Sequence, residues 1–275
     1  MRGNNWRILV LAAIGAASLG AASARADDCG DSASGFSEWL SSFKQVAISD
    51  GVSPGVVETA LAGVTYDPAV KAHDHGVAAF GRNAAGFAAS HITPGRIKRG
   101  KTMLLAYAEP FEKIEQRYGV PAPVLVAIWG LETDFGAGNG TFPTFTALAT
   151  LAYDCRRAQR YRAELIDALM LVQRGMVHPG QLRGAWAGEI GQTQFMPSAY
   201  LKFATTPDGG SGGDLVHNSA DALASTANFL HAHGWVRDAG WDEGQPNFAA
   251  LLEWNSAPIY ARTVALFADR LAGKD

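Results

Sequence analysis

The chain has 275 residues, 48% of them hydrophobic, and a formal net charge of −3. This length and composition suit a globular protein with a sizeable core. The acidic balance lacks the clustered Lys and Arg on which nucleic-acid binding rests, so a nucleic-acid-binding protein is excluded.

The first 26 residues have the layout of a secretory signal peptide. Arg2 and Arg7 precede an apolar run at about 8–19, and small residues flank an arginine at 24–26. The run is well short of the ~20 residues that a bilayer-spanning helix needs, so we expect cleavage after residue 26 rather than a membrane anchor. Removing three arginines from 23 basic residues leaves 20 against 26 acidic residues, a formal charge of −6 for the exported part. No other apolar run is long enough to span a membrane, so the exported part is expected to be soluble.

The two cysteines, Cys29 and Cys155, both lie in the exported part. Two cysteines in an oxidising compartment usually pair, so we expect a disulfide between them. The alternative, a nucleophilic cysteine, needs a poised histidine that the sequence does not indicate.

Apolar residues recur at intervals of three and four along most of the chain, which predicts a mainly α-helical protein. The first helix is expected in "GFSEWLSSFKQVAISDG". A second helix should begin with Ser53 as its cap and Pro54 at its first position. A long third helix should begin at Thr93, kink near Pro110 and end at Gly119.

Two more amphipathic helices are predicted further along, in "RAELIDALMLVQRGM" and "SADALASTANFLHAHGW". No sustained alternation of period two occurs, so strands are not expected. The glycine-rich stretch 205–218 is expected to be a surface loop. It has neither the Gly-Lys-Ser/Thr of a phosphate-binding loop nor the closing glutamate of a calcium loop.

The stretch "VLVAIWGLETDFG", residues 124–136, contains a carboxylate in an otherwise apolar run. Val124, Ile128 and Glu132 are spaced by four, so they share one face of a helix. Burial raises the pKa of a carboxylate, which suits proton donation near neutral pH. A helix-end carboxylate held by a buried hydrogen bond explains the position of Glu132 equally well.

The stretch "LRGAWAGEIGQTQFMPSAYLKFA", residues 182–204, combines tight glycine turns, amides and aromatic rings. The amides of Gln192 and Gln194 offer both donors and acceptors to sugar hydroxyl and acetamido groups. This composition favours a carbohydrate groove, with a generic turn between helices as the alternative.

These two stretches, followed by "ADALASTANFLHAHGW", resemble the lytic murein transglycosylase B family. The similarity runs in the same order from about Trp39 to about Leu266. It implies a lysozyme-like helical catalytic domain with an N-terminal helical lobe, acting on peptidoglycan without a cofactor. The domain is expected to cover residues 27–275, with the N-terminal helical part at about 30–95 and the catalytic core at about 96–270.

The resemblance puts the family's single catalytic glutamate on Glu132. It puts the glutamine that contacts an N-acetyl sugar on Gln194. The segment "EWNSAPIY" resembles the part of the family's groove around the scissile bond. The expected substrate-binding residues are therefore Gln194, Phe195, Tyr200, Trp254, Asn255 and Tyr260.

On the family's pattern, Glu132 protonates the oxygen that leaves between N-acetylmuramic acid and N-acetylglucosamine. It then removes a proton from the muramic 6-hydroxyl, which closes a 1,6-anhydro ring without water. Ala185 departs from the pattern, because some members have a serine there. No metal is expected, because His231 and His233 are spaced by two and face different sides of a helix.

Two other functions stay open. A lysozyme-type hydrolase would need Glu189 or Asp134 as a second carboxylate. A glycan-binding scaffold would keep the groove without turnover. In each case the expected partner is a peptidoglycan glycan strand, and the family resemblance implies a periplasmic location.

Overall fold

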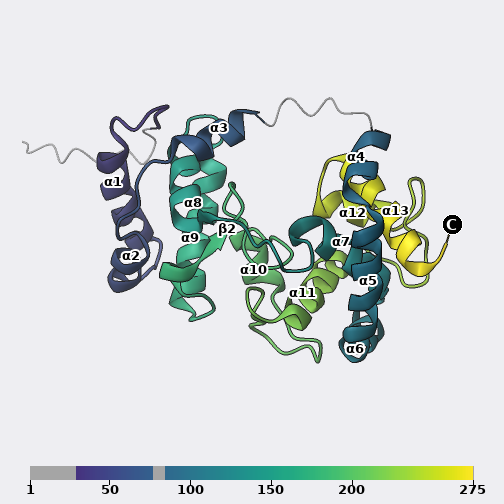
Figure 1. Cartoon of the computed structure of the whole chain (residues 1–275). Helices are drawn as coiled ribbons and strands as arrows, with labels where there is room; N and C mark the ends of the chain where they lie inside the picture. Colours follow the sequence, from purple (N-terminus) through teal and green to yellow (C-terminus); the bar gives the residue numbers. More distant parts are fainter. Residues whose placement is uncertain (1–28, 77–83, 275) are drawn as a thin grey trace, which may run out of the picture.

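The computed structural model describes residues 29–76 and 84–274, so the expected signal peptide lies outside the described residues. These residues are mainly helical, and the helices are arranged along an elongated molecule (Figure 1). No helix among residues 29–76 and 84–274 combines the length and apolar character needed to cross a bilayer.

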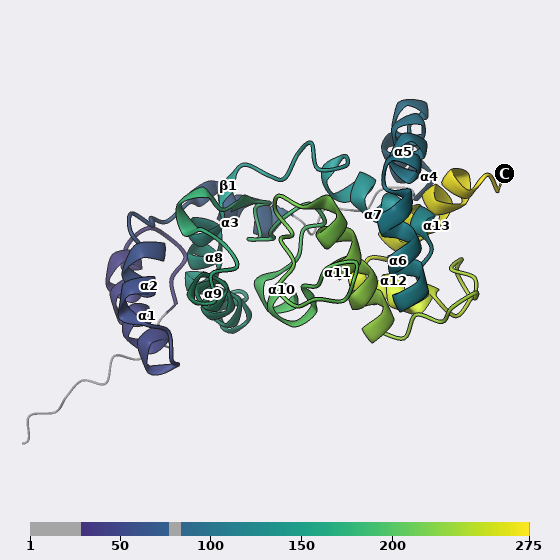
Figure 2. The same ribbon diagram turned by 90° about the horizontal axis from the view of Figure 1, so that it is seen from below.

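The helices at one end of the molecule belong to what we call the α9 half (Figures 1 and 2). Its helices are α1 (Phe36–Ser49), α2 (Pro54–Ala60), α3 (Pro68–Gly76), α8 (Thr144–Tyr153), α9 (Ala158–Gln173) and α10 (Pro197–Phe203). They enclose a hydrophobic cluster drawn from residues 36–70 and 145–222.

The helices toward the other end form the α7 half. Its helices are α4 (Ala84–His91), α5 (Pro94–Ala106), α6 (Ala108–Tyr118), α7 (Ala122–Thr133), α11 (Ser219–Ala232), α12 (Phe248–Trp254) and α13 (Pro258–Ala272). They enclose a second hydrophobic cluster, from residues 92–129 and 223–271. Although α3 and α4 are consecutive elements, they lie in different halves (Figure 1). The division into an N-terminal part at about 30–95 and a catalytic core at about 96–270 stays a prediction. The hydrophobic cluster of the α9 half contains residues from both parts, because α8–α10 pack with α1–α3.

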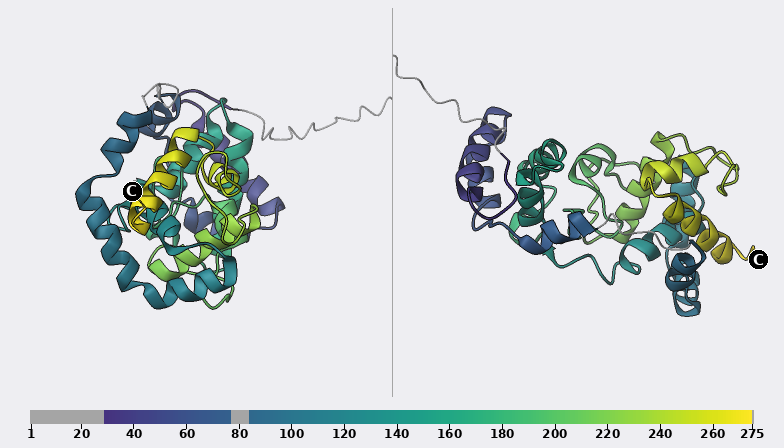
Figure 3. Two further views of the ribbon diagram at one scale, coloured as in Figure 1. Left: turned by 90° about the vertical axis from the view of Figure 1, so that its right-hand side faces the viewer. Right: turned by 90° about the horizontal axis from the view of Figure 1, so that it is seen from above.

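Helix α7 forms the centre of its half, packed closely against α13 and α5. Every residue from Val124 to Gly130 is buried, and the stretch carries no charged side chain. The end-on view in Figure 3 shows α13, in yellow, beside the helices of this half. The helix that carries Glu132 is therefore held on all sides.

Local sequence signals place several helix ends as expected. Thr93 is the N-cap of α5, and its hydroxyl oxygen accepts a hydrogen bond from the Arg96 backbone N–H at 3.2 Å. Pro54 begins α2, and Gly119 ends α6 with a positive φ of 71°. A proline at the first turn and a left-handed glycine after the last turn are the usual boundaries of a helix.

The long helix expected between Thr93 and Gly119 is two helices. They break at Tyr107, which has φ −112° and is the C-cap of α5 and the N-cap of α6. Pro110 lies in the first turn of α6, where the missing N–H costs no intrahelical hydrogen bond. The predicted break near Pro110 is therefore present, three residues before the proline, but it separates two helices instead of kinking one.

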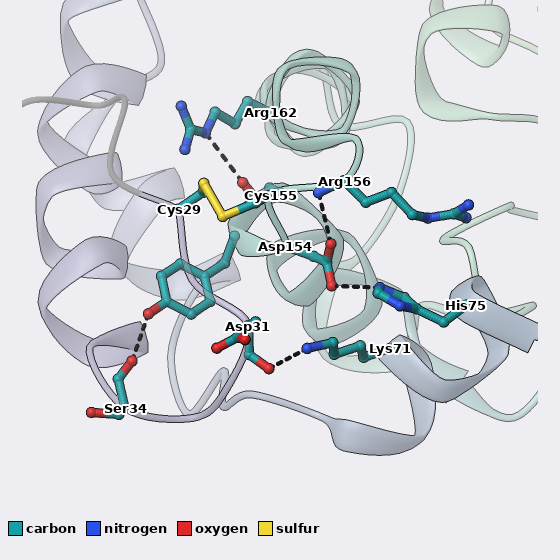
Figure 4. Close-up of a disulfide and its surroundings, with 11 residues drawn as sticks. Cys29, Asp31, Ser34, Lys71, His75, Asp154, Cys155, Arg156 and Arg162 are labelled. Carbon is teal, nitrogen blue, oxygen red and sulfur yellow. Dashed lines mark hydrogen bonds and ion pairs between the residues drawn. A yellow bond between two sulfur atoms is a disulfide. The ribbon is translucent and has the colours of Figure 1, made fainter.

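The predicted disulfide between Cys29 and Cys155 is confirmed (Figure 4). It ties the start of the described chain to the turn between α8 and α9. The backbone N–H of Gly30 also donates to the carbonyl of Tyr153 at 3.0 Å, beside the bridge.

The only sheet in the described ranges is minimal. It pairs β1 (Phe142–Pro143) with β2 (Arg183–Gly184) in antiparallel register. A Cβ on Gly184 would lie 1.7 Å from the Glu189 carbonyl oxygen, and one on Gly191 would lie 2.4 Å from the Leu215 carbonyl oxygen. These two glycines therefore allow neighbouring backbone to pack directly against the turn.

Candidate active site

Glu132 lies in the last turn of α7, next to Thr133, which joins this helix to the segment 190–196. The buried hydroxyl of Thr133 donates to the Gln192 carbonyl oxygen at 2.6 Å and accepts from the Gly136 N–H at 2.9 Å. One side chain therefore fixes the end of α7 against the Gln192–Gln194 turn.

Helix α7 ends in an unusual run of left-handed residues. Asp134 has φ 53° and Phe135 has φ 63°, a region that non-glycine residues rarely occupy. The turn folds the Phe135 ring back over Gly130, where a Cβ would lie 2.8 Å from the ring. Gly130 thus makes room for the turn that presents Glu132 at the helix end.

Asp134 faces away from Glu132 and pairs with two arginines of α5. Its Oδ1 accepts hydrogen bonds from Arg96, at 3.1 Å, and from Arg99. Partial burial opposes ionisation, but the hydrogen bonds from Arg99 and Arg96 outweigh it and lower the pKa of Asp134. As an ion-paired helix-end group, Asp134 is unsuited to act as a second catalytic carboxylate.

The carboxylate of Glu132 receives two hydrogen bonds on the same oxygen. The Tyr260 hydroxyl donates to Oε1 at 2.5 Å, and the Trp254 indole N–H donates to Oε1 at 3.1 Å. Burial raises the pKa of Glu132 to about 7, the hydrogen bonds from Tyr260 and Trp254 oppose the rise, and the charge of Glu189 adds to it. A carboxyl group with this pKa can both donate and accept a proton near neutral pH.

Glu132 lines a cavity of about 810 Å³ whose walls come from both halves of the molecule. The wall from the α7 half includes Glu132, Phe229, Glu253, Trp254, Asn255 and Ser256. The wall from α9 and the segment 185–199 includes Arg156, Arg157, Arg160, Tyr161, Glu164, Ala185, Trp186, Ala187, Glu189, Gln194, Phe195, Met196, Ser198 and Ala199. From the segment 182–204, Trp186, Gln194 and Phe195 thus face one space together with charged groups.

Gln194 lines this cavity from a strained backbone position, with φ 57°. Its amide nitrogen donates to the Gly191 carbonyl at 2.6 Å and to the Asn139 carbonyl at 3.3 Å. Because these bonds use both amide hydrogens, the side-chain oxygen is the group that remains to accept a hydrogen bond from a ligand. Gln192 lies outside the cavity wall, and its amide oxygen accepts from the Ser219 hydroxyl at 2.9 Å.

Trp254 is supported from beneath by aromatic rings. Phe195 is only 2% exposed, and its ring centroid lies 5.1 Å from that of Trp254 in an edge-to-face arrangement. Phe229 packs against the same indole at 5.1 Å. Phe195 reaches the cavity wall, but its main contact is with the indole that hydrogen-bonds Glu132.

Tyr200 does not reach the cavity. Its side chain is fully buried, and its hydroxyl donates to the Gly213 carbonyl at 3.2 Å and accepts from the Leu215 N–H at 3.1 Å. The substrate contact predicted for Tyr200 is therefore wrong, because a ring with no exposed surface cannot touch a sugar. Its role is to hold the loop 205–218 against α10.

Asn255 and Tyr260 lie on either side of the start of α13. The side-chain oxygen of Asn255 accepts from the Ala257 N–H at 3.0 Å, which shapes the turn between α12 and α13. This turn places Trp254 and Asn255 in the cavity wall. Tyr260 is not part of that wall and contacts the site through its hydrogen bond to Glu132, so a substrate contact by Tyr260 stays a prediction.

Glu189, the other candidate for a second carboxylate, does line the cavity. Its Oε2 accepts a hydrogen bond from the Ala187 N–H at 3.1 Å, and burial raises its pKa. Glu189 is thus close enough for its charge to raise the pKa of Glu132. Its own carboxylate, however, is hydrogen-bonded within the turn that contains it.

The sequence did not predict the three arginines of the cavity wall. Arg156, Arg157 and Arg160 stand in "CRRAQR", at the start of α9, and the run is visible in the sequence. Nothing local indicates that this turn faces Glu132, because the two meet only through the packing of α8 and α9 beside the segment 185–199.

The histidines considered for a metal site are engaged at helix ends. His231 Nδ1 lies 3.2 Å from the Tyr118 carbonyl oxygen, and His233 Nδ1 lies 2.7 Å from the Phe229 carbonyl oxygen. In each histidine, Nδ1 is therefore within hydrogen-bonding distance of a backbone carbonyl oxygen.

Comparison with known proteins identifies related sequences and structures. Residues 35–244 match the family described as "Transglycosylase SLT domain". The membrane-bound lytic murein transglycosylase B of Escherichia coli (strain K12) is 36% identical over 147 residues, which are 53% of this chain and 40% of that protein. The match therefore spans about two fifths of the length of that relative.

Solved structures extend the similarity over most of the chain. SltB3 from Pseudomonas aeruginosa, in complex with NAG-anhNAM-pentapeptide, is 30% identical with a TM-score of 0.81, covering 86% of this chain and 80% of that one. SltB1 from Pseudomonas aeruginosa, a soluble lytic transglycosylase, is 25% identical with a TM-score of 0.77, covering 85% and 98%. These matches confirm the mainly α, lysozyme-like fold, and the family match covers more than half of the sequence. The chain belongs to the transglycosylase SLT domain family.

Proposed function

We propose that this protein is a lytic murein transglycosylase. It cleaves the β-1,4 bond between N-acetylmuramic acid and N-acetylglucosamine in peptidoglycan and leaves 1,6-anhydromuramoyl ends. Its partners are peptidoglycan glycan strands. The observation that carries the proposal is the placement of Glu132, with a pKa of about 7, in a cavity lined by Gln194, Trp254 and Asn255.

In the first step, protonated Glu132 donates its proton to the glycosidic oxygen as the bond to the anomeric carbon breaks. The leaving N-acetylglucosamine takes that proton as its new hydroxyl hydrogen. The substrate's own acetamido oxygen stabilises the positive charge that develops at the anomeric carbon.

In the second step, ionised Glu132 accepts the proton of the muramic 6-hydroxyl, whose oxygen attacks the anomeric carbon. The 1,6-anhydro ring closes, Glu132 is protonated again, and no water is consumed. A pKa near the working pH is needed in both directions, which burial balanced by the Tyr260 and Trp254 hydrogen bonds supplies.

The other residues of the site supply binding and orientation. The free oxygen of the Gln194 amide suits the N–H of an acetamido group, and the Trp254 face suits a sugar ring. The complex of SltB3 with NAG-anhNAM-pentapeptide contains an anhydro sugar, which supports a product of this class here.

Hydrolysis is the second candidate, because Glu189 lines the same cavity. To activate a water, Glu189 must be ionised and free to accept a proton. Its raised pKa and its hydrogen bond to the Ala187 N–H weaken both conditions. The hydrogen bonds that Tyr260 and Trp254 donate to Glu132 argue against the third function, a glycan-binding scaffold without turnover.

The proposal includes export to the periplasm and a catalytic domain over residues 27–275. The disulfide between Cys29 and Cys155 supports an oxidising compartment. The resemblance of residues 1–26 to a signal peptide supports cleavage before that bridge.

The test is incubation of the purified protein, residues 27–275, with isolated sacculi, followed by mass spectrometry of the soluble muropeptides. Products one water lighter than reducing muropeptides support the transglycosylase. Reducing ends would overturn it in favour of the hydrolase, and no release would leave a glycan-binding protein.

A further inference from the structure

A second cavity lies at the end of α9, away from Arg160 near the start of that helix. It has a volume of about 400 Å³, and its walls come from the segments 174–182 and 212–217. Arg174, the C-cap of α9, follows Arg160 by 14 positions, which is roughly 21 Å along a helix. No residue that lines this cavity also lines the cavity of Glu132. The two cavities are therefore separate.

Hydrogen bonds within the protein fix both walls of the second cavity. The Tyr200 hydroxyl donates to the Gly213 carbonyl at 3.2 Å and accepts from the Leu215 N–H at 3.1 Å. On the opposite wall, the Met176 N–H donates to the Leu171 carbonyl at 3.0 Å, which closes the turn after α9. The cavity is therefore preformed, as small-molecule sites usually are.

The acidic residue of this cavity is engaged by its own loop. Asp214 Oδ1 accepts from the N–H groups of Val216 and His217, each at 2.9 Å. Asp214 Oδ2 lies 3.1 Å from His217 Nδ1. Partial burial opposes ionisation, but these hydrogen bonds outweigh it and lower the pKa of Asp214. Both carboxylate oxygens therefore have donors close at hand.

Two basic side chains on the other wall have no such partner. Arg174 and His178 line the cavity and are exposed. Neither side chain forms a hydrogen bond or an ion pair with another residue that the structure describes. Burial and the charge of Glu164 raise the pKa of Asp167, and the charge of Arg174 opposes that rise without an ion pair between them. The cavity thus has an unmatched positive charge in its wall.

Most of the remaining lining is apolar. Val177 and Leu182 are 7% and 5% exposed, and Met176 and Val216 pack against the same hydrophobic cluster. Among the described residues that line the cavity, none is Trp, Tyr or Phe, so a sugar ring has no aromatic face to stack on. A small apolar group with a negative charge at one end matches this lining, because a guanidinium presents a planar set of N–H donors to a carboxylate.

We propose that this cavity is a second binding site, which takes a short peptide ending in a free carboxylate. Arg174 and His178 bind the carboxylate, and Val177 and Leu182 contact the small apolar side chain beside it. The inference goes beyond the proposed function, because it requires neither a glycan nor a catalytic step. Two sources can supply such a ligand: the peptides of peptidoglycan, which contain D-alanine, and ordinary peptides of L residues.

Binding is measured by nuclear magnetic resonance on protein labelled at the methionine methyl groups. Met176 lines this cavity and Met196 lines the cavity of Glu132, so each methyl group reports on one site. The Met176 signal is assigned by its loss in Met176→Leu. The probe is N-acetyl-D-alanyl-D-alanine, added as the free acid and, in a second series, as the C-terminal amide.

The free acid is expected to shift the Met176 signal to saturation with a Kd of about 1 mM, as suits a ligand of about 14 non-hydrogen atoms. The amide is expected to bind about tenfold more weakly, because it carries no charge for the guanidinium. The same titration with the L,L dipeptide distinguishes the two sources. Tighter binding of the D,D form supports peptidoglycan peptides as the ligand, and tighter binding of the L,L form supports ordinary peptides.

Arg174→Gln is expected to weaken binding of the acid about tenfold and to make the acid and the amide equivalent. His178→Gln should weaken binding of the acid by a smaller factor, because it removes one donor. The control is Arg270→Gln, which removes the same charge from an exposed position in the last turn of α13. It should leave the Kd unchanged.

Several results would overturn the inference. These are no shift of the Met176 signal up to about 20 mM acid, equal shifts by acid and amide, or no effect of Arg174→Gln. A shift of the Met196 signal alone would place the carboxylate in the cavity of Glu132 and would also overturn it. Formation of anhydro ends is measured separately, so failure of this inference and failure of the proposed function are distinguishable.

Discussion

Tyr260 and Glu132, 128 positions apart in the chain, share a 2.5 Å hydrogen bond from the phenolic hydroxyl to Oε1. The Trp254 indole donates to the same oxygen at 3.1 Å. Both protein donors therefore stabilise the ionised form through one oxygen, and Oε2 is left to exchange a proton with substrate. The consequences for activity and for stability can be measured separately.

Glu132→Gln is expected to abolish release of muropeptides and to increase stability at pH 8. The folded-state pKa of Glu132 is raised from 4.5 to about 7, so its ionised form destabilises the fold above pH 7. A neutral amide removes that penalty, which is about 3 kcal/mol. The gain should shrink as pH falls from about 7 and vanish below about 4.5, where the carboxyl is protonated in both the folded and unfolded states.

Urea unfolding at pH 8 and at pH 4 checks the stability of Glu132→Gln. A loss of stability at pH 8, comparable to the loss of activity, would favour a purely structural carboxylate. Asp134→Asn serves as the contrasting variant. The arginine partners lower its pKa, so removing its charge should destabilise the protein at pH 8.

Tyr260→Phe is expected to move the alkaline limb of the pH profile of kcat/KM to higher pH. The proton donor must be protonated, so wild-type activity should fall above pH about 7. The Tyr260 hydrogen bond lowers the pKa of Glu132, and losing it raises that pKa further. Tyr66→Phe, which removes a hydroxyl bonded to the Asp31 carbonyl at 3.3 Å, should leave the profile in place. A shift toward lower pH in Tyr260→Phe would contradict this account.

Thr133→Val is expected to destabilise the protein by about 2 kcal/mol, because it leaves the Gln192 carbonyl and the Gly136 N–H without their buried partner. It should also lower kcat, since the end of α7 loses its link to the turn that carries Gln194. Urea unfolding and initial rates on sacculi measure the two effects. Thr102→Val, on the exposed face of α5, should change stability by less than about 0.5 kcal/mol. Full stability in Thr133→Val would show that other contacts hold this junction.

The double substitution Cys29→Ser, Cys155→Ser is expected to cost about 2–5 kcal/mol of unfolding free energy, because the bridge closes a segment between residues 126 apart. Thermal unfolding with and without reductant provides a matched measurement on the unmodified protein. Identical midpoints under the two conditions would mean that the hydrogen bonds around Asp154 suffice to hold this turn.

Features with a local cause were predictable from the sequence. Thr93 and Pro94 mark the start of α5 because a hydroxyl cap and a fixed φ act within one turn. Glu132 was identifiable because an isolated carboxylate in an apolar helix stands out and because the surrounding motif resembles a known family. Pairing of Cys29 with Cys155 followed from there being two cysteines in the expected exported part.

Features that depend on distant packing were not predictable. Helix α8 has no amphipathic pattern because it is buried on every side, so its periodicity gave no signal. Tyr200 stands in the same strip as Gln194, and the sequence cannot distinguish a ring that supports a loop from one that faces a ligand. The direction of Arg156 depends on Asp74, 82 positions earlier in the chain.

The two hydrophobic clusters are interleaved along the chain. One draws on residues 36–70 and 145–222, and the other on residues 92–129 and 223–271. No single cut in the polypeptide therefore separates one intact core from the other. A protease that nicks one surface loop should release no independently folded fragment, and neither half can be produced as one continuous piece. In topological terms, the stretch that contains Glu132 is an insertion into the half that carries the arginines. Each core therefore contains two chain segments that are separated in sequence by a segment of the other core.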